Sequence, residues 1–208
     1  MSLLKVPNKV QIYLKKSDQS TIAQFGKCIV NFFGFADKGS GYVGFIHEGN
    51  TFTIYELQSP EDSSAVLIRH ATECPVFKMT NETPLPQELQ EKGVGMGVAV
   101  LLTSSDQSVL VTRRAPHMRT FPGVWVPPGG HVEPGETVLK AGLRELQEET
   151  GLNLENTSYH ILGLWESVYP HKLEYGDPVR QHIVIYLALA SSLPSWELTK
   201  LLKVNSPS

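Results

Sequence analysis

The sequence contains only two cysteines, Cys28 and Cys74, among 208 residues. Their wide separation gives neither a C-x-x-C pair nor a set of zinc ligands, so we expect two reduced thiols. No run of residues approaches the ~18 apolar residues that span a bilayer. The N-terminus also lacks the basic start, apolar stretch and cleavage site of a secretion signal. These absences predict a cytoplasmic protein without a membrane segment.

An excess of positive charge is absent too. Eighteen Lys and Arg against 21 Asp and Glu give a formal net charge of −3. This balance argues against a protein held to nucleic acid by a broad basic surface, although it permits a local basic groove. A nucleic-acid ligand would then be recognised at an end or a small group. With 41% hydrophobic residues, the chain is long enough for one core, or for a domain with a smaller appendage.

Residues 1–90 are predicted to form a small β-rich N-terminal region. Strand-like runs separated by Gly, Asn, Asp and Ser clusters occur at 10–14 (VQIYL), 28–35 (CIVNFFGF) and 42–57 (YVGFIHEGNTFTIYEL). This region contains no catalytic motif. Residues 78–97 have the proline, glycine and polar composition of a linker, which places a domain boundary near residue 90.

Residues 91–190 alternate between strands and a helix. A predicted hairpin joins strands at 97–103 and 109–115, and the loop PPGGHVEPGE excludes regular structure until Glu136. A helix follows over 137–150, and Gly151 stands where a C-cap glycine belongs. Two more strands are predicted at 159–169 and 182–190. Strands on both sides of a helix indicate an α/β domain.

The predicted helix separates apolar from acidic side chains. Leu139, Leu143, Leu146 and Thr150 share one narrow arc, and Glu145, Glu148 and Glu149 gather opposite it. A solvated face would explain the carboxylates. However, like charges at i, i+4 cost a few tenths of a kcal/mol unless a cation collects there. Carboxylates on one rigid face suit magnesium, and the preceding Gly-rich loop can offer backbone groups to a metal or phosphate.

The same segment carries a specific motif. Gly130, Glu136, Arg144-Glu145-Leu146, Glu148-Glu149 and Gly151-Leu152 match every specified position of G-x5-E-x7-R-E-U-x-E-E-x-G-U, where U is aliphatic. On these residues the chain resembles the Nudix hydrolases. The resemblance implies an α/β/α sandwich with a mixed sheet. It also implies that the enzyme hydrolyses a pyrophosphate linkage in a nucleotide-type substrate.

The resemblance also implies roles for the motif residues. Glu145, Glu148 and Glu149, with the backbone carbonyl near Gly130, would hold Mg²⁺ or Mn²⁺. Arg144 would orient these carboxylates, and Glu136 would be structural. The metal would activate water for attack on phosphorus, without a covalent intermediate, and either Glu145 or Glu148 would accept the proton.

Substrate preference depends on residues outside the motif. The segments VLVTRRA, WVPPGGHVE, LGLWESVYP and HIVIYLALA are similar to a vertebrate Nudix group assigned to hydrolysis of the methylated 5′ cap of messenger RNA, releasing 7-methyl-GDP. Cap recognition needs aromatic faces and groups that bind phosphate. The candidate substrate-binding residues are Arg113, Arg114, Trp125, His131 and Tyr169. Trp165 is a further aromatic candidate, and Glu166 is a candidate extra metal ligand or base.

Two other functions remain open at this point. Tyr169 lies 17 residues beyond the motif, which is similar to the position of a tyrosine in diadenosine polyphosphate hydrolases. The enzymatic alternative is therefore a dinucleotide or nucleotide-sugar pyrophosphatase, of the diadenosine polyphosphate, ADP-ribose, NADH or coenzyme A type. The short, atypical tail 191–208 replaces a longer strand and helix of the family. We expect it to reduce activity or solubility, and the extreme case is a truncated, non-catalytic binding protein. No stable protein partner is predicted, and the oligomeric state is left open.

Overall fold

The structure, a computed structural model, describes residues 9–59, 61–79, 85–118, 120–154 and 157–202. Residues 1–8, where a secretion signal would lie, and the end of the tail, 203–208, are outside these ranges. Among the described helices, none is long and apolar enough to cross a membrane.

Five strands lie in the described part of the N-terminal half. They are β1 (Gln11–Lys16), β2 (Gln19–Ile22), β3 (Ser40–Glu48), β4 (Thr51–Glu56) and β5 (Val66–His70). Short helical elements accompany them: α1 (Ile29–Phe32), η1 (Ala36–Lys38), α2 (Pro75–Lys78) and α3 (Gln87–Lys92). The strand predicted over 28–35 is wrong, because this segment contains the short helix α1, with Cys28 as its N-cap. Its apolar run did not distinguish a strand from a buried helical turn.

Among the residues described in the C-terminal half there are six strands, of which three are long. They are β6 (Gly95–Thr103), β7 (Thr112–Arg113), β8 (Trp125–Val126), β9 (Gly129–His131), β10 (Tyr159–Tyr169) and β11 (Arg180–Ala190). The helices are α4 (Val138–Thr150), η2 (Leu173–Tyr175) and α5 (Ser195–Leu201). The α/β class with a mixed sheet is confirmed.

The predicted helix is confirmed with both of its ends. Thr137 caps α4 and accepts a hydrogen bond from the Lys140 backbone N–H at 3.2 Å. Gly151 ends it in the left-handed conformation, with φ 77°. Val138, Ala141, Gly142, Leu146 and Thr150 are the buried residues of the helix. A Cβ on Gly142 would lie 2.8 Å from Leu187 Cδ1, so this glycine lets α4 pack closely on β11.

Two predictions around the loop needed correction. The strand expected over 109–115 is reduced to the two residues of β7, which pair with β8, and to one bridge between Val109 and Thr103. The loop expected to lack regular structure contains β9, which pairs with β6. A Cβ on Gly129 would lie 2.1 Å from the Val98 carbonyl oxygen, so glycine is what allows this close pairing.

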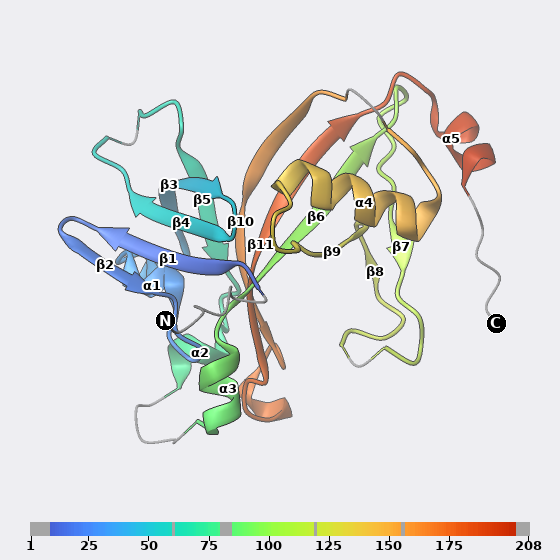
Figure 1. The fold of residues 1–208 in the computed structure, drawn as a ribbon. Helices are drawn as coiled ribbons and strands as arrows, with labels where there is room; N and C mark the ends of the chain where they lie inside the picture. Colours follow the sequence, from blue (N-terminus) through green and yellow to red (C-terminus); the bar gives the residue numbers. More distant parts are fainter. Residues whose placement is uncertain (1–8, 60, 80–84, 119, 155–156, 203–208) are drawn as a thin grey trace, which may run out of the picture.

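All strands except β7 and β8 form one nine-stranded sheet in the order β2-β1-β4-β3-β5-β10-β11-β6-β9 (Figure 1). The N-terminal strands join the others through a short parallel seam between β5 and β10, from Ile68–Leu164 to His70–Glu166. One core of buried residues runs across the seam and includes Ile12 and Ile185. A second core under α4 includes Leu146 and Leu198, so α5 is packed onto the domain.

The two cysteines are not isolated thiols. The fold brings the Cys28 and Cys74 sulfur atoms together with His70 and Glu166, and the four ligand-capable atoms lie within 4.8 Å of one another. Both cysteines are free, as expected, but their separation in the sequence gave no sign of this cluster. Interaction with Cys28 lowers the pKa of Cys74 to about 7. Interaction with Cys74, together with burial, raises the pKa of Cys28.

Candidate active site

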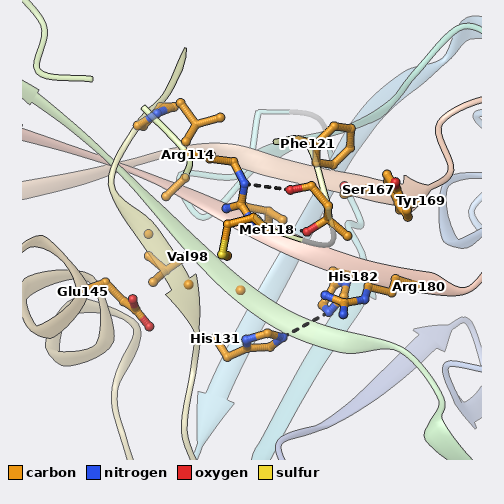
Figure 2. A pocket seen from close by; sticks show the side chains of 18 of the residues that line it. Val98, Arg114, Met118, Phe121, His131, Glu145, Ser167, Tyr169, Arg180 and His182 are labelled. Carbon is orange, nitrogen blue, oxygen red and sulfur yellow. Dashed lines mark hydrogen bonds between the residues drawn. The ribbon is translucent and has the colours of Figure 1, made fainter. Parts of the chain in front are cut away.

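A cleft of about 690 Å³ lies beside the N-terminal loop of α4. Its walls come from β6, β9, β10 and β11 and from the segment 114–121 (Figure 2). The cleft has two chemically different ends. Glu145 of α4 lies at one end, and Arg180, Phe121 and Tyr169 lie at the other.

Gly130 and Glu145 make the closest approach at the acidic end. A Cβ on Gly130 would lie 2.3 to 2.6 Å from the three carboxylate atoms of Glu145, so only glycine leaves room for this carboxylate. Both residues line the cleft. The first glycine of the motif therefore has a steric function that is visible in the structure.

Glu149 is the second carboxylate of the cleft. It accepts a hydrogen bond from the Thr112 hydroxyl at 3.0 Å and a longer one from the Gly129 N–H at 3.5 Å. Burial raises the pKa of Glu149 despite these bonds, and the nearby Glu145 charge acts in the same direction. A cation at this end of the cleft would offset both effects.

Arg144 links the motif loop to the helix. Its Nε and Nη2 donate to the two carboxylate oxygens of Glu136 at 2.8 and 2.9 Å. Its Nη2 also donates to the His131 carbonyl at 3.0 Å, and its Nη1 donates to Glu145 at 2.9 Å. The Arg144 guanidinium lowers the pKa of Glu136. Arg144 thus fixes both the loop and the Glu145 carboxylate.

Glu148 has a different environment. Its side chain is 59% exposed, its contact with Arg144 Nη1 is 3.4 Å, and it is not among the residues that line the cleft. In this structure, Glu145 and Glu149 face the cleft, and Glu148 lies at its solvent side.

Basic and aromatic side chains form the other end. Arg114 and Arg180 line it. Arg114 is held by the Thr120 carbonyl and hydroxyl, at 2.9 and 3.2 Å. Phe121 and Tyr169 lie edge to face, with ring centroids 5.2 Å apart. The guanidinium groups can meet phosphates and the rings can meet a base.

A histidine pair lies between the two ends. The Nε2 atoms of His131 and His182 are 3.3 Å apart (Figure 2). Burial lowers the pKa of His182 to about 4, and His131, Arg180 and Lys92 act in the same direction. His182 is therefore neutral at pH 7.

The structure brings together only part of the predicted site. Gly130, Glu145, Glu149, Arg114, His131 and Tyr169 all line the cleft. Arg113 is exposed and donates to the Gly123 carbonyl, and Trp125 beside it is 61% exposed on the β7–β8 ribbon. Neither is among the lining residues. Trp165 lines a separate cavity, and Glu166 is buried beside Cys28.

Sequence reasoning missed Arg180, His182, Phe121 and His117, all of which line the cleft. The strand periodicity of β11 could have identified Arg180 and His182. Alternate residues of a strand face the same side, and Arg180, His182, Val184 and Tyr186 of β11 all line the cleft. Phe121 offered no such signal, because it follows a segment with little regular structure.

The donor set at the acidic end fits a hard divalent cation. Glu145 and Glu149 supply carboxylate oxygens, and the glycine at 130 keeps the space around Glu145 open. Arginines at the other end can bind the phosphate groups of the same ligand. The cleft is therefore suited to an extended, negatively charged ligand with a planar ring at one end.

Comparison with known proteins agrees with the motif. The model of the family described as NUDIX domain matches residues 93–200. The m7GpppN-mRNA hydrolase NUDT17 of Xenopus laevis is 44% identical over 189 residues, which cover 88% of this chain and 63% of that protein. Its counterpart in Danio rerio is 42% identical over 189 residues, 88% of this chain and 62% of that protein. The predicted likeness to the vertebrate cap-hydrolysing group is confirmed.

The relatives are longer than this chain, which spans about 63% of the length of the Xenopus laevis protein. Among solved structures, a MutT protein from Methanosarcina mazei Go1 is 27% identical. The similarity covers 46% of this chain and 62% of that chain, with a TM-score of 0.38.

Proposed function

Because the chain belongs to the Nudix family, we propose that it hydrolyses a pyrophosphate linkage in a nucleotide-type substrate, with the methylated 5′ cap of messenger RNA as the preferred form. The observation that carries the proposal is a single cleft with Glu145 on one side and Arg180, Phe121 and Tyr169 on the other (Figure 2). A cap has the matching order of parts: a positively charged base, a phosphate chain and the first nucleotide of the RNA.

Glu145 and Glu149, with the loop at Gly130, would hold Mg²⁺ or Mn²⁺, with Glu148 as a further ligand from the solvent side. When bound, the ion neutralises phosphate charge and lowers the pKa of a water molecule. Hard oxygen donors favour these ions over softer metals.

The chain's own residues then have distinct tasks. Glu145 would accept the proton of the attacking water, because it lines the cleft while Glu148 does not. The water oxygen forms a bond to phosphorus as the bridging anhydride bond breaks, and the leaving phosphate takes the electron pair. Arg144 holds Glu145 in place through its 2.9 Å hydrogen bond. Attack that releases 7-methyl-GDP leaves the RNA with a 5′-phosphate.

Arg114 and Arg180 would neutralise phosphates away from the point of attack. Phe121 and Tyr169 would receive the methylated base after their edge-to-face contact opens. Stacking and cation–π contacts of this kind contribute about 1 to 3 kcal/mol. These substrate contacts rest on their position in the cleft and on the similarity to proteins named as cap hydrolases.

A dinucleotide or nucleotide-sugar pyrophosphatase is the second candidate. Tyr169 favours it, because the residue predicted from diadenosine polyphosphate hydrolases does line the cleft. Both candidates use the same carboxylates and differ in what the aromatic end accepts.

The proposal also includes a cytoplasmic location and an N-terminal unit ending near residue 90, where α3 lies.

Product analysis would test the function. The 208-residue chain, with Mg²⁺, is offered methyl-capped RNA, ADP-ribose, NADH, coenzyme A and diadenosine polyphosphates. Glu145→Gln is the inactive variant, and Glu88→Gln, in the exposed helix α3, is the matched control. Cap hydrolysis would be supported if the wild type and Glu88→Gln release 7-methyl-GDP and Glu145→Gln does not. Preferred turnover of another substrate would favour the second candidate, and no turnover by folded protein would contradict both.

A further inference from the structure

We propose that Cys28, His70, Cys74 and Glu166 form a second metal site, for zinc, separate from the carboxylate site in the cleft. The four residues are at most 8% exposed. Each offers one ligand atom, and these four atoms all lie within 4.8 Å of one another. No other group of three or more such side chains with this geometry occurs within the described ranges.

The distances from Cys28 to two of the other donors fit the edges of a tetrahedral site. With zinc bond lengths of about 2.3 Å to sulfur and 2.0 to 2.1 Å to nitrogen or oxygen, neighbouring donors of a tetrahedron are roughly 3.3 to 3.8 Å apart. Cys28 Sγ lies 3.6 Å from His70 Nδ1 and 3.3 Å from Glu166 Oε2. Small side-chain movements would therefore be enough to close the site around an ion.

The chemistry of the donors selects the metal. Two sulfur atoms and one imidazole nitrogen are soft or borderline ligands that suit Zn²⁺, whereas Mg²⁺ prefers oxygen. The cleft, in contrast, offers carboxylates. Two thiolates and one carboxylate also supply enough negative charge to hold a buried divalent cation. The chain would thus carry two metal sites with different selectivity.

Neighbouring groups already hold two of the ligands in place. The Asn31 backbone N–H donates to Cys28 Sγ at 3.3 Å. Glu166 Oε1 accepts from the Ile29 N–H at 2.9 Å and from Gln181 Nε2 at 2.8 Å. Outer hydrogen bonds of this kind orient metal ligands. Zinc would replace the Cys28 thiol hydrogen bond to Glu166, with the thiol protons released to solvent.

The site lies at the seam of the sheet. His70 and Glu166 are register partners at the end of the short β5–β10 pairing. Cys28 precedes α1 and Cys74 precedes α2. A bound ion would therefore connect the N-terminal strands to β10, whose Ser167 and Tyr169 line the catalytic cleft.

A cavity also borders two of the four donors. A cavity of about 230 Å³ reaches Cys74 and Glu166 and is lined as well by Phe121, Ser167 and His171. Phe121 and Ser167 also belong to the walls of the cleft. Two of the donors therefore border a cavity that shares two lining residues with the cleft.

Metal analysis of the full 208-residue chain tests the proposal. The protein, free of any affinity tag, is produced with Zn²⁺ in the medium and dialysed against a weak chelator, and bound metals are measured by mass spectrometry. Cys74→Ser and His70→Gln remove one ligand each. Glu145→Gln is the control, because it alters the cleft and leaves the buried cluster intact. A parallel sample is stripped and reloaded with Co²⁺, whose absorption reports tetrahedral thiolate ligation.

We expect about one zinc per chain in the wild type and in Glu145→Gln. Cys74→Ser and His70→Gln should retain at least tenfold less, in line with the loss of one ligand. The Co²⁺ form should show sulfur-to-metal charge-transfer absorption that Cys74→Ser loses. Folded wild-type protein with two free thiols and no bound zinc would overturn the proposal. A Cys28–Cys74 disulfide, detected as a mass loss of two hydrogens, would overturn it as well.

Discussion

Arg144 binds both carboxylate oxygens of Glu136, through Nε at 2.8 Å and Nη2 at 2.9 Å. This two-point contact joins the start of the motif to its middle. Because the same guanidinium donates to Glu145 at 2.9 Å, the position of the Glu145 carboxylate depends on the loop at Glu136. A point charge without the planar fork would hold only part of this arrangement.

We therefore expect Arg144→Lys to lower kcat/KM by about 10- to 100-fold and to raise the Mg²⁺ concentration needed for half-maximal rate. The reason is that lysine keeps the charge and cannot contact Glu136 and Glu145 together. Mg²⁺ titrations of the hydrolysis rate measure the effect. Arg113→Lys, on the exposed ribbon, is the control and should leave the titration unchanged. Equal Mg²⁺ curves for Arg144→Lys and the wild type would contradict the positioning role.

Gly130 provides a second test, based on space. In Gly130→Ala the new methyl group would meet the Glu145 carboxylate at 2.3 to 2.6 Å, so the carboxylate must move. We expect kcat to fall by about 100-fold, because a displacement on the order of 1 Å has this effect on catalytic groups. Steady-state kinetics with saturating Mg²⁺ measure it.

Gly135→Ala separates activity from stability. Gly135 lies in the same loop with φ +81°, and among the described residues no atom outside its immediate neighbours would lie within 4 Å of its Cβ. We expect a loss of about 1 to 2 kcal/mol of unfolding free energy from the left-handed conformation, with kcat retained. If both variants lose activity in proportion to their stability, the steric account of Gly130 is wrong.

The parts of the fold that the sequence predicted depend on short-range patterns. The helix over 137–150 is set by a 3.6-residue period, by Thr137 and by Gly151, all within one segment. The long strands at 159–169 and 182–190 also follow from local sequence, as strand-like runs separated by a polar turn. The segment 28–35 is equally apolar, yet too short to carry a period, so its helical turn was not predictable.

The site was less predictable because it depends on contacts between distant segments. Arg180 and His182 reach the cleft only because β11 pairs with both β6 and β10. Trp125 is an aromatic residue next to the motif, but the two-residue strand β8 leaves it exposed. The four ligands of the proposed zinc site come from three distant parts of the chain, and no local spacing links them. Resemblance to a family transfers roles only within its motif.

The aromatic end of the cleft provides a third prediction. Tyr169→Ala should raise KM for a capped dinucleotide by about 5- to 100-fold, because it removes one ring that can stack on the methylated base. Its effect on kcat should be smaller, since Tyr169 lies away from Glu145. Trp125→Ala is the aromatic control and should change KM little. A large effect of Trp125→Ala with none of Tyr169→Ala would show that the base binds outside the cleft.

His182 makes stability depend on pH. Burial, His131, Arg180 and Lys92 lower its pKa from 6.5 to about 4 in the folded protein. Between these pH values the unfolded chain binds the proton and the folded chain does not, so acidification destabilises the fold. His182 contributes no such loss above pH 6.5, and the loss is complete once the pH falls below about 4. At pH 5 it should be about 1 to 2 kcal/mol.

Urea unfolding of the wild type and His182→Asn at pH 7 and pH 5 measures this contribution. Asparagine keeps a polar side chain and does not titrate, so the variant should lose less unfolding free energy than the wild type on acidification. His160→Asn, at an exposed position of β10, is the matched control and should follow the wild type. His160→Asn shows the effect of removing an exposed histidine, so the difference between His182→Asn and His160→Asn reports what is particular to the His182 position. If His182→Asn and the wild type lose the same unfolding free energy between pH 7 and pH 5, folding does not lower the pKa of His182, and the prediction is wrong.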